Sequence, residues 1–332
     1  MNKKIKIFAY DVQPFELNYL VEITNNIGIC FQFTEHPLTE KNVDLCVGYD
    51  GISVIGYSRV NEDIINKLYH QGINIVSTRT VGYDNIDIEY ARKKGLVVCH
   101  AQYAPNNIAE FTVMLALMLL RKIKQLINRT SDDFSLPSSA CMQLSEAKVG
   151  VIGTGKIGKL VVQILKGFGS DIIAYDINPS DELISTVTYV DIDTLYRDSD
   201  IVLVLIPGNK ENHHFINDAA FKKMKDGCIF INTVRGSIVE TGSLIDALKS
   251  GKLGGVGLDV IEGESNVMHH SNITENRENE HIFLLKRLPN VIYTPHCAFY
   301  TQEAIREMVN SGVVSIVNEI KGISNPYRVN NL

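Results

Sequence analysis

One short segment near the middle of the chain restricts the fold more than any other. Residues Val149–Gly153 read as an apolar strand that runs directly into the pattern Gly153-Thr-Gly155-Lys-Ile-Gly158, and the amphipathic stretch Lys159–Phe168 follows. In a strand–GxGxxG–helix unit, the first glycine permits a tight turn and the second lets a phosphate approach the backbone. The third lets the helix pack closely on the sheet. The segment therefore predicts a dinucleotide-binding domain.

An acidic residue in the right place supports this interpretation. Asp176 ends the next predicted strand, Ile172–Asp176, and lies eighteen residues after Gly158. A carboxylate at this position accepts hydrogen bonds from both hydroxyls of the adenosine ribose, and it repels a 2′-phosphate. We therefore predict that the cofactor is NAD rather than NADP.

Length and charge restrict the class of protein. A chain of 332 residues can bury a large core and favours two domains. The net charge of −6 argues against nucleic acid or an anionic membrane as the main partner. The longest apolar run, Val113–Leu120, is much shorter than a membrane span. The polar start Met1–Lys4 shows no signal peptide, so we expect a cytoplasmic protein.

The cysteines and histidines show no metal-type spacing. None of the six cysteines forms a CxxC pair, and several lie in apolar segments, as reduced core thiols do in a reducing compartment. The pairs His213-His214 and His269-His270 lie in polar segments with no cysteine or carboxylate at ligand spacing along the chain. We therefore predict that the protein binds no metal.

Short apolar runs alternate with helical stretches along the whole chain, which predicts parallel sheets with crossover helices. Because the glycine pattern lies near the middle, two doubly wound α/β domains in tandem fit better than one large sheet, with the active-site cleft between them. We assign residues 101–299 to the dinucleotide-binding domain, and residues 1–100 with 300–332 to a substrate-binding domain that includes a returning helix, Glu303–Lys321. The expected strands are Ile5–Ala9, Leu45–Gly48, Ile52–Ile55, Ile73–Ser77, Leu96–Cys99, Val149–Gly153, Ile172–Asp176, Ile201–Ile206, Cys228–Asn232, Gly255–Val260 and Val291–Thr294.

The segments between the strands give three further expectations. A helix that opens at Pro105 is apolar nearly all round, so we expect it to be buried between domains or between subunits, which favours a homodimer. Asp132–Ser139 is predicted to be a loop, and Val267–Glu280 a polar excursion on the surface.

Three side chains with complementary chemistry follow three predicted strands of the second domain. Arg235 follows the strand that ends in Ile-Asn-Thr-Val234, Glu264 follows Leu258-Asp-Val-Ile-Glu-Gly263, and His296 follows Ile292-Tyr-Thr-Pro295. Carboxyl ends of parallel strands meet at one edge of a sheet, so we expect the three to lie together. A cation that binds a carboxylate, a proton donor and a carboxylate that orients it are what hydride transfer to a 2-oxo acid requires.

The sequence resembles the D-isomer-specific 2-hydroxyacid dehydrogenases. The resemblance is carried by the glycine pattern and by five further blocks that extend over most of the chain: Thr78–Asp87, Tyr103–Glu110, Lys225–Gly236, Gly254–Glu264 and Thr294–Thr301. Glu262-Gly-Glu264, a long insert after it, and His296-Cys-Ala-Phe-Tyr-Thr301 resemble the branch of D-lactate and D-2-hydroxyisocaproate dehydrogenases, which includes the vancomycin-resistance D-lactate dehydrogenases.

The resemblance implies a role for each matching position. Arg235 is expected to hold the substrate carboxylate, His296 to act as acid and base at the C2 oxygen, and Glu264 to orient His296. An ionised carboxylate stabilises the imidazolium and keeps its proton available near neutrality. The backbone amides of Val81 and Gly82 are expected to bind the substrate carboxylate, and Tyr103 and Phe299 to line the substrate side. The implied NAD-binding residues are Gly153, Gly155, Lys156, Ile157, Gly158, Asp176, Pro207, Asn212, Thr233 and Asp259.

Two questions stay open at this stage. One alternative function is an NAD(H)-sensing binding protein of the corepressor type, because such proteins share the scaffold; formate dehydrogenase is a weaker alternative, because its chemistry needs no acid beside an alkoxide. The substrate is also open between pyruvate and a branched-chain or aromatic 2-oxo acid such as 2-oxoisocaproate. Ile55, on a strand end of the first domain, is smaller than an aromatic residue and leaves room for a longer side chain.

Overall fold

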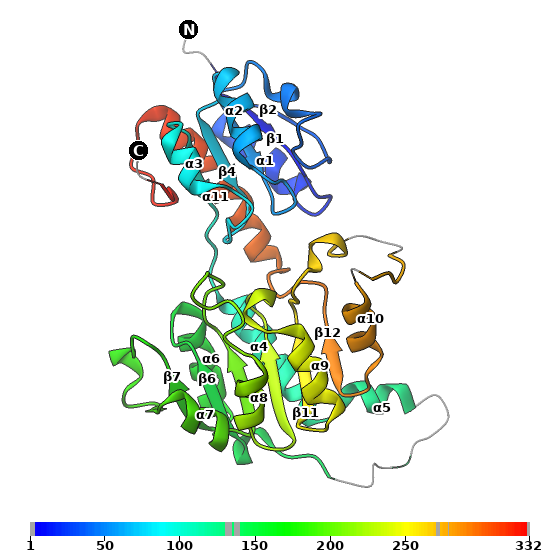
Figure 1. The fold of residues 1–332 in the computed structure, drawn as a ribbon. Coiled ribbons are helices and arrows are strands. Elements are labelled where there is room, and N and C mark those ends of the chain that lie inside the picture. The colour runs from blue at the N-terminus through cyan, green and yellow to red at the C-terminus, as the bar shows by residue number, and fades with distance from the viewer. Residues whose placement is uncertain (1–3, 130–134, 136–139, 270–272, 278, 331–332) are drawn as a thin grey trace. The chain divides into compact units, whose positions relative to one another are not determined.

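The structure is a computed structural model that describes residues 4–129, 135, 140–269, 273–277 and 279–330. The chain divides into two compact units. The first unit consists of Met1–Ala104 and Tyr300–Leu332, and the second of Pro105–Phe299. Figure 1 shows the elements of both units, each of which is described separately below.

The first unit is built on a five-stranded parallel sheet with the order β2-β1-β3-β4-β5. Helices α1 and α11 supply side chains to the core on one face of this sheet, and α2 and α3 supply side chains to the core on the other. The elements are β1 (Lys6–Ala9), α1 (Leu17–Ile27), β2 (Cys30–Phe33), β3 (Gly51–Val54), α2 (Glu62–His70), β4 (Ile75–Thr78), α3 (Ile88–Lys93), β5 (Val97–His100) and α11 (Gln302–Lys321).

The strand sequences explain why helices cover both faces. Successive side chains of a strand point to opposite faces, so a strand covered on both sides must be apolar throughout. In β1, Ile7 and Ala9 join the core under α1 and α11, while Phe8 joins the core under α2. The returning helix α11 begins at Thr301, whose side chain accepts a hydrogen bond from the Ala304 N–H, and ends at Gly322 in the left-handed conformation.

One strand prediction for the first unit is wrong, and one strand of this unit was not predicted. The expected strand Leu45–Gly48 is a short 3₁₀ helix, Val43–Cys46, in which the Val43 carbonyl oxygen accepts a hydrogen bond from the Tyr10 hydroxyl at 3.0 Å. The edge strand β2 was not expected. Its residues are half-buried or exposed, so its sequence lacks the continuous apolar run of a central parallel strand.

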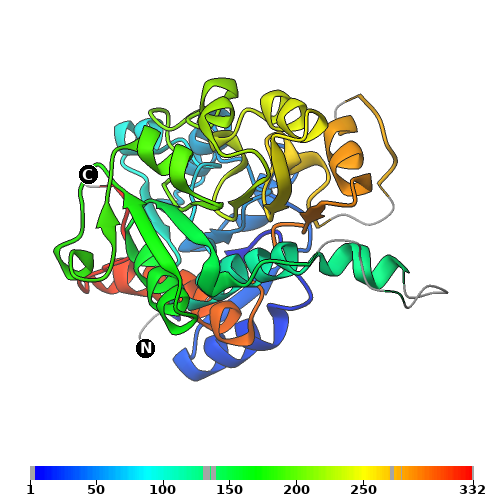
Figure 2. The same ribbon diagram turned by 90° about the horizontal axis from the view of Figure 1, so that it is seen from below.

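The second unit contains a seven-stranded parallel sheet with the order β12-β11-β10-β9-β6-β7-β8. Helices α4 and α6 contribute to the core on one face, and α7 to α10 contribute to the core on the other; Figure 2 shows helices on both sides of the strands. The elements are α4 (Asn106–Leu120), α5 (Ile123–Arg129), β6 (Lys148–Ile152), α6 (Lys156–Gly167), β7 (Asp171–Tyr175), β8 (Thr188–Tyr189), α7 (Ile192–Asp198), β9 (Ile201–Val204), α8 (Asp218–Lys223), β10 (Cys228–Asn232), α9 (Thr241–Lys249), β11 (Leu253–Leu258), α10 (Glu280–Arg287) and β12 (Val291–Tyr293).

Strand order in this unit places a switch point at its centre. The chain runs outward from β6 to β7 and β8, and then returns to place β9 on the other side of β6. Neighbouring loops therefore leave β6 and β9 in opposite directions, and in open parallel sheets ligands bind in the crevice formed there. The prediction of two doubly wound parallel-sheet domains is confirmed.

The apolar helix after Pro105 is α4, and its partner is the sheet of its own unit. Val113, Leu115, Ala116 and Leu119 belong to the core that α4 shares with α6 and with the strands. Met114 is exposed on the opposite side of the helix. The expected loop Asp132–Ser139 lies outside the described residues except for Ser135. The expected excursion Val267–Glu280 is described only in part, and it contains the buried Met268.

Two further properties concern the described residues as a whole. None of the helices described is both long and apolar enough to cross a membrane. All six cysteines fall within the described ranges, and none is joined to another in a disulfide. Burial raises the pKa of both Cys99 and Cys228 to about 12, so these thiols stay protonated at neutral pH.

Candidate active site

The three residues proposed for chemistry follow three adjacent strands of the second unit. Arg235 comes after β10, Glu264 after β11 and His296 after β12, and these strands lie side by side and parallel. The glycine turn after β6, Asp176 after β7 and Pro207 after β9 lie at the same edge of the sheet. The topology thus places the proposed catalytic residues and the proposed cofactor residues of this unit along one edge.

His296 and Glu264 form a direct pair at this edge. The Nδ1 atom of His296 lies 2.7 Å from Oε1 of Glu264, and Oε2 of the same carboxylate accepts a hydrogen bond of 2.6 Å from the Ile261 N–H. The Glu264 side chain is 17% exposed and that of His296 is 36% exposed. The carboxylate is therefore held in place by the backbone, while the imidazole remains accessible from solvent.

Asp259 fixes the turn that carries the imidazole. Its Oδ1 accepts hydrogen bonds from the Thr294 hydroxyl (2.6 Å) and the Cys297 N–H (2.9 Å), and its Oδ2 accepts one from the Ala298 N–H (2.8 Å). The His296 N–H donates to the Asp259 carbonyl oxygen at 2.8 Å, with His296 in the left-handed region at φ 50°. Asp259 is fully buried and both its carboxylate oxygens bind the turn. Its contact with NAD stays a prediction.

Arg235 is held by its neighbours on both sides. Its Nη1 donates to the Val234 carbonyl oxygen at 2.8 Å, and its own carbonyl oxygen accepts a hydrogen bond from the Asn232 side-chain amide at 2.8 Å. The stem of Arg235 lies against Gly208, where a Cβ atom would overlap the arginine Cγ. A Cβ at Gly236 would likewise overlap the backbone of Ile261, so the loops after β10 and β11 touch only because this residue is glycine.

The glycine turn has the shape that a bound pyrophosphate requires. A Cβ at Gly158 would overlap the Gly153 carbonyl oxygen, and Gly153 itself has φ 99° and lies against the Leu205 carbonyl. At Gly155, in contrast, a Cβ would meet no described atom within 4 Å, so the backbone at the start of α6 is open to a ligand. The residues therefore fit a dinucleotide phosphate at this turn.

Asp176 points back toward the same turn. Its Oδ2 accepts hydrogen bonds from the Thr154 N–H at 2.6 Å and the Thr154 hydroxyl at 3.0 Å, and its Oδ1 accepts one from the Asn178 N–H at 2.8 Å. The Tyr189 hydroxyl donates to the Thr154 hydroxyl oxygen at 3.0 Å. The carboxylate at the end of β7 is thus oriented by the turn beside which a ribose would lie.

The remaining residues predicted to bind NAD differ in exposure. Pro207 is exposed, and its carbonyl oxygen accepts a hydrogen bond from the Asn212 side-chain amide at 2.8 Å, which closes the loop after β9. Lys156 is exposed and Ile157 half-buried at the first turn of α6. Thr233 is buried, and its hydroxyl lies 2.7 Å from that of Thr112 on α4.

The predicted substrate residues lie partly in each unit. Phe299 belongs to the second unit, where its carbonyl oxygen accepts a hydrogen bond from the Asn107 side-chain amide at 3.1 Å. The others belong to the first unit: Val81 is 41% exposed, Gly82 and Tyr103 are half-buried, and Ile55 is buried. The turn that carries Val81 and Gly82 is closed by a hydrogen bond of 2.6 Å from the Thr80 hydroxyl to the Gly82 carbonyl oxygen.

Directly before this turn lies a buried arginine that the sequence did not reveal. Arg79, immediately before Thr80, is fully buried and forms an ion pair with Glu16, which is also fully buried. The Arg79 Nε donates to Glu16 Oε1 at 2.7 Å, and Nη2 donates to Oε2 at 3.1 Å. An arginine between polar residues at a strand end gives no sign of burial in the sequence, because its partner is sixty-three residues away.

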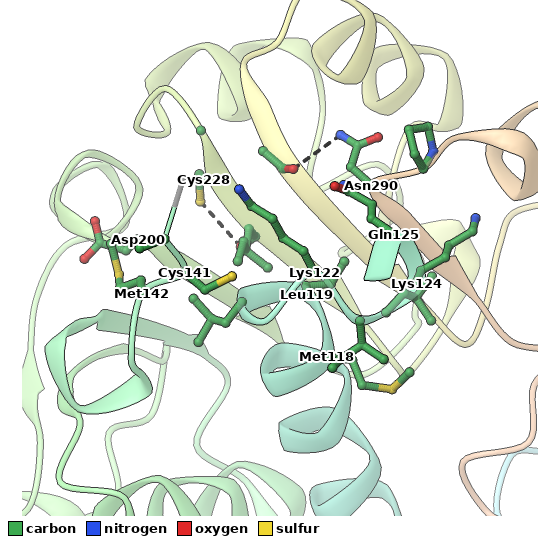
Figure 3. A pocket seen from close by; sticks show the side chains of 18 of the residues that line it. Met118, Leu119, Lys122, Lys124, Gln125, Cys141, Met142, Asp200, Cys228 and Asn290 are labelled. Atoms are coloured by element: carbon green, nitrogen blue, oxygen red, sulfur yellow. Dashed lines mark hydrogen bonds between the residues drawn. The ribbon is translucent and has the colours of Figure 1, made fainter. Parts of the chain in front are cut away.

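A pocket of about 280 Å³ in the second unit is distinct from the candidate active site. Asp200, Cys228, Gly254 and Asn290 line it, and they lie at the amino ends of four adjacent strands (Figure 3). In a parallel sheet this is the edge opposite to the one that carries Arg235. The pocket therefore does not belong to the candidate active site.

Comparison with known proteins gives the family. Residues 113–298 match the family model "D-isomer specific 2-hydroxyacid dehydrogenase, NAD binding domain". The chain is 36% identical over 329 residues to an aromatic 2-oxoacid reductase of Clostridium sporogenes (strain ATCC 7955), covering 98% of this chain and 99% of the relative.

Two further relatives support the same assignment. A D-lactate dehydrogenase of Lactiplantibacillus plantarum is 36% identical over 314 residues, covering 92% of this chain and 93% of the relative. The solved structure of a D-2-hydroxyisocaproate dehydrogenase matches with a TM-score of 0.88 and 32% identity, covering 98% of this chain and all of that one. The chain is therefore an NAD-dependent oxidoreductase that belongs to the D-isomer-specific 2-hydroxyacid dehydrogenase family.

Proposed function

We propose that this protein reduces a small 2-oxo acid to the (R)-2-hydroxy acid, with His296 as the proton donor. The observation that carries the proposal is the pair between His296 Nδ1 and Glu264 Oε1, at the same sheet edge as Arg235. Bound NADH supplies the hydride for this reaction. The protein residues have to bind the substrate, orient it and deliver one proton.

Arg235 is the proposed ligand of the substrate carboxylate. A guanidinium presents two parallel N–H groups that match the two oxygens of a carboxylate, and this geometry fixes the plane of the substrate as well as its position. The contact with Gly208 and the hydrogen bond to the Val234 carbonyl oxygen restrict the rotation of the Arg235 side chain. An arginine held in this way is pre-organised for a planar anion.

His296 is the proposed acid in reduction and base in oxidation. With Nδ1 committed to Glu264, the other ring nitrogen, Nε2, is the atom that can exchange a proton with the C2 oxygen. As negative charge develops on that oxygen, the Nε2 proton transfers to it and the imidazole becomes neutral. Glu264 stabilises the imidazolium before the transfer, and the turn fixed by Asp259 keeps the ring in place.

Residues of the second unit hold the cofactor in this proposal. The open backbone at Gly155, with Lys156 and Ile157, is assigned to the pyrophosphate, and Asp176 to the ribose hydroxyls. The loop Pro207–Asn212 and Thr233 are assigned to the remainder of the dinucleotide. In the first unit, the backbone amides of Val81 and Gly82 remain the predicted second ligand of the substrate carboxylate. Tyr103 and Ile55 of the first unit and Phe299 of the second are the predicted contacts of the substrate side chain.

The proposed substrate class is the aliphatic and aromatic 2-oxo acids. The names of the relatives include an aromatic 2-oxoacid reductase, a D-lactate dehydrogenase and a D-2-hydroxyisocaproate dehydrogenase, whose substrates share the 2-oxo or 2-hydroxy carboxylate and differ in side chain. That shared group is what Arg235 and His296 are proposed to bind. A homodimer also remains a prediction, which light scattering of the purified protein tests.

The test is a comparison of kcat/KM for pyruvate, 2-oxoisocaproate and phenylpyruvate with NADH, followed by chiral analysis of the product. The proposal predicts turnover of at least one of these acids at catalytic concentrations of protein, with only the (R)-2-hydroxy acid formed. Tight binding of NADH without turnover of any of the three would instead support the sensing function. Formation of the (S) product would contradict the proposed arrangement of Arg235 and His296.

A further inference from the structure

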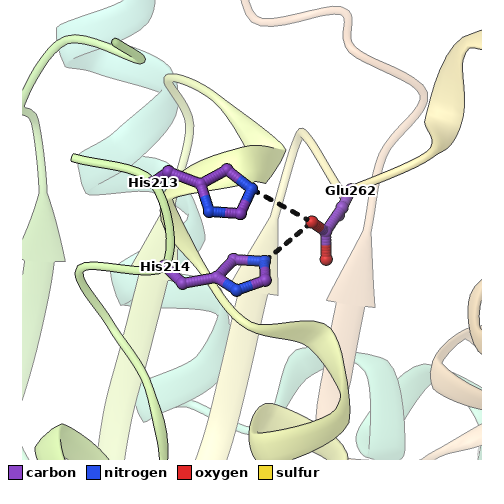
Figure 4. Close-up of side chains that lie close together, drawn as sticks. All are labelled: His213, His214 and Glu262. Atoms are coloured by element: carbon purple, nitrogen blue, oxygen red, sulfur yellow. Dashed lines mark hydrogen bonds and ion pairs between the residues drawn. The ribbon is translucent and has the colours of Figure 1, made fainter. Parts of the chain in front are cut away.

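Two histidines and a glutamate, distant in the sequence, meet at the surface of the second unit. We name His213, His214 and Glu262 the His-His-Glu cluster (Figure 4). The Nε2 atom of His214 lies 2.7 Å from Oε1 of Glu262, and Nε2 of His213 lies 3.9 Å from the same oxygen. No carboxylate lies at ligand spacing along the chain from this pair, but the fold brings one to it from forty-eight residues beyond His214.

The backbone holds both sides of the cluster firmly. The His214 N–H donates a hydrogen bond to the Ser237 carbonyl oxygen at 2.9 Å. Two residues further along, the Ile216 N–H donates one to the Ile238 carbonyl oxygen at 3.0 Å. His214 adopts φ 52°, in the left-handed region that residues other than glycine seldom occupy. On the other side, Glu262 follows Ile261, whose backbone lies directly against Gly236. The positions of the three side chains are thus set by two anchored loops.

The two imidazoles are arranged as ligands of one centre. Their rings stack with centroids 3.9 Å apart and planes 29° apart, and Figure 4 shows both Nε2 atoms directed at the same carboxylate. The ligand atoms of all three residues lie within 4.8 Å of one another. Two ligand atoms on one tetrahedral zinc ion are separated by about 3.4 Å when each metal–ligand bond is about 2.1 Å. The observed separations of 2.7 Å and 3.9 Å lie on either side of that value, so small side-chain rotations suffice.

We propose that the His-His-Glu cluster binds a divalent transition-metal ion of the zinc type, with water completing the coordination. Two imidazole nitrogens and one carboxylate oxygen suit Zn²⁺ and Co²⁺, whereas Mg²⁺ and Ca²⁺ prefer oxygen ligands alone. Side-chain exposures of 55%, 32% and 37% for His213, His214 and Glu262 leave the cluster open to an ion from solution. A single hydrogen bond between His214 and Glu262 is the competing explanation, and it gives His213 no role.

A bound ion would join two functional loops of the same unit. One loop carries Asn212, directly before His213, and the other carries Glu264, two residues after Glu262. An ion that binds the folded arrangement and not the unfolded chain stabilises the fold by mass action. This inference does not depend on the proposed reaction, since binding and thermal stability report it without substrate.

The experiment is a titration of the full chain with Co²⁺ and with Zn²⁺ after treatment with EDTA. Calorimetry gives the stoichiometry, the visible Co²⁺ spectrum gives the ligand type, and Tm is measured with and without the ion. We expect one ion per chain, a spectrum of nitrogen and oxygen ligands, and a higher Tm. In His213→Ala and Glu262→Gln the affinity should fall by at least about tenfold. His36→Ala, which removes an exposed histidine of the first unit, should bind like the wild type.

The variants also separate this site from the alternatives. His213→Ala is the sharper test, because it leaves the hydrogen bond between His214 and Glu262 intact and removes only the second imidazole. Equal affinity in the wild type and in His213→Ala would overturn the proposal, as would no binding at millimolar ion. An intense thiolate-to-cobalt absorption band would also overturn it, because it would place the ion on cysteine.

Discussion

His296 Nδ1 lies 2.7 Å from Glu264 Oε1, across two loops that follow adjacent strands of the second sheet. The second oxygen of Glu264 binds the Ile261 N–H, so the carboxylate is oriented by the loop that carries it. With Nδ1 of His296 paired to Glu264, Nε2 is the ring nitrogen to which we assign the proposed proton transfer.

Replacing Glu264 with Gln keeps the size of the side chain and removes its charge. The amide oxygen is a weaker acceptor than a carboxylate, so the His296 ring is held less firmly and kcat for 2-oxo acid reduction should fall about tenfold or more. Steady-state kinetics measure kcat, and fluorescence measures the affinity for NADH, which should stay at the wild-type value. Loss of NADH affinity together with kcat would indicate a structural role only, and a wild-type kcat would contradict the orienting role of Glu264.

Replacing Arg235 with Lys keeps the positive charge and removes the planar pair of donors. A hydrogen bond to a charged group contributes roughly 1.5–3 kcal/mol, so loss of one such contact should lower kcat/KM by at least about tenfold. NADH affinity, measured by fluorescence, should change little. Turnover close to that of the wild type would refute the assignment of Arg235 as the carboxylate ligand.

Gly208 supports Arg235 by being small. A methyl group at Gly208 would overlap the arginine stem, so Gly208→Ala should displace the guanidinium and lower kcat/KM by roughly 10- to 100-fold, since misplacement of about 1 Å has effects of that size. Gly242→Ala is the matched control, because a Cβ there meets no described atom within 4 Å and the residue lies in α9. Equal activities of Gly208→Ala and Gly242→Ala would mean that a methyl group at Gly208 does not disturb the function of Arg235.

Asp11 gives the first unit a pH-dependent stability. Burial raises the pKa of Asp11 to about 6, although Arg79 acts in the opposite direction and Glu16 adds to the rise. A folded-state pKa above the unfolded value of 3.8 means that the folded protein binds the extra proton, so stability is lost as the pH rises from 3.8 through 6. The cost of ionising Asp11 amounts to about 3 kcal/mol above pH 6.

Asp11→Asn carries no charge and should not show this loss. The free energy of unfolding of the variant relative to the wild type should therefore rise by about 3 kcal/mol between acid and neutral pH. Urea denaturation at a series of pH values measures the difference. A difference that is constant with pH would show that Asp11 is ionised equally in the folded and unfolded chains.

Much of the fold could be predicted because central parallel strands are apolar throughout. The apolar runs of β6, β9 and β10 could be identified as strands without knowledge of their contacts in the folded protein. The edge strands β2 and β8 were not expected, because they are short and half-exposed and so lack that pattern. Val43 and Cys46 are buried in a 3₁₀ helix, which the periodicity of a short apolar run cannot distinguish from a short strand.

The sequence also placed Arg235, Glu264 and His296 at strand ends, and parallel topology then brought them to one edge. It could not predict contacts that depend on loop conformation. The binding of the 294–298 turn by Asp259, the contact of Gly208 with Arg235 and the approach of Glu262 to His214 all join segments that are distant in the chain. Nothing in the local composition of these segments indicates which partner each will meet.

Whether His296 donates the proton to the substrate is tested most directly by a paired measurement on His296→Gln, which keeps a polar side chain without an acidic proton. NADH binding is followed by fluorescence, and reduction of the best 2-oxo acid by the loss of NADH absorbance in a single turnover. We expect wild-type affinity for NADH and a rate of reduction lowered at least about a hundredfold. Reduction at a rate near that of the wild type would contradict this role of His296, because the proton would then have to come from another group.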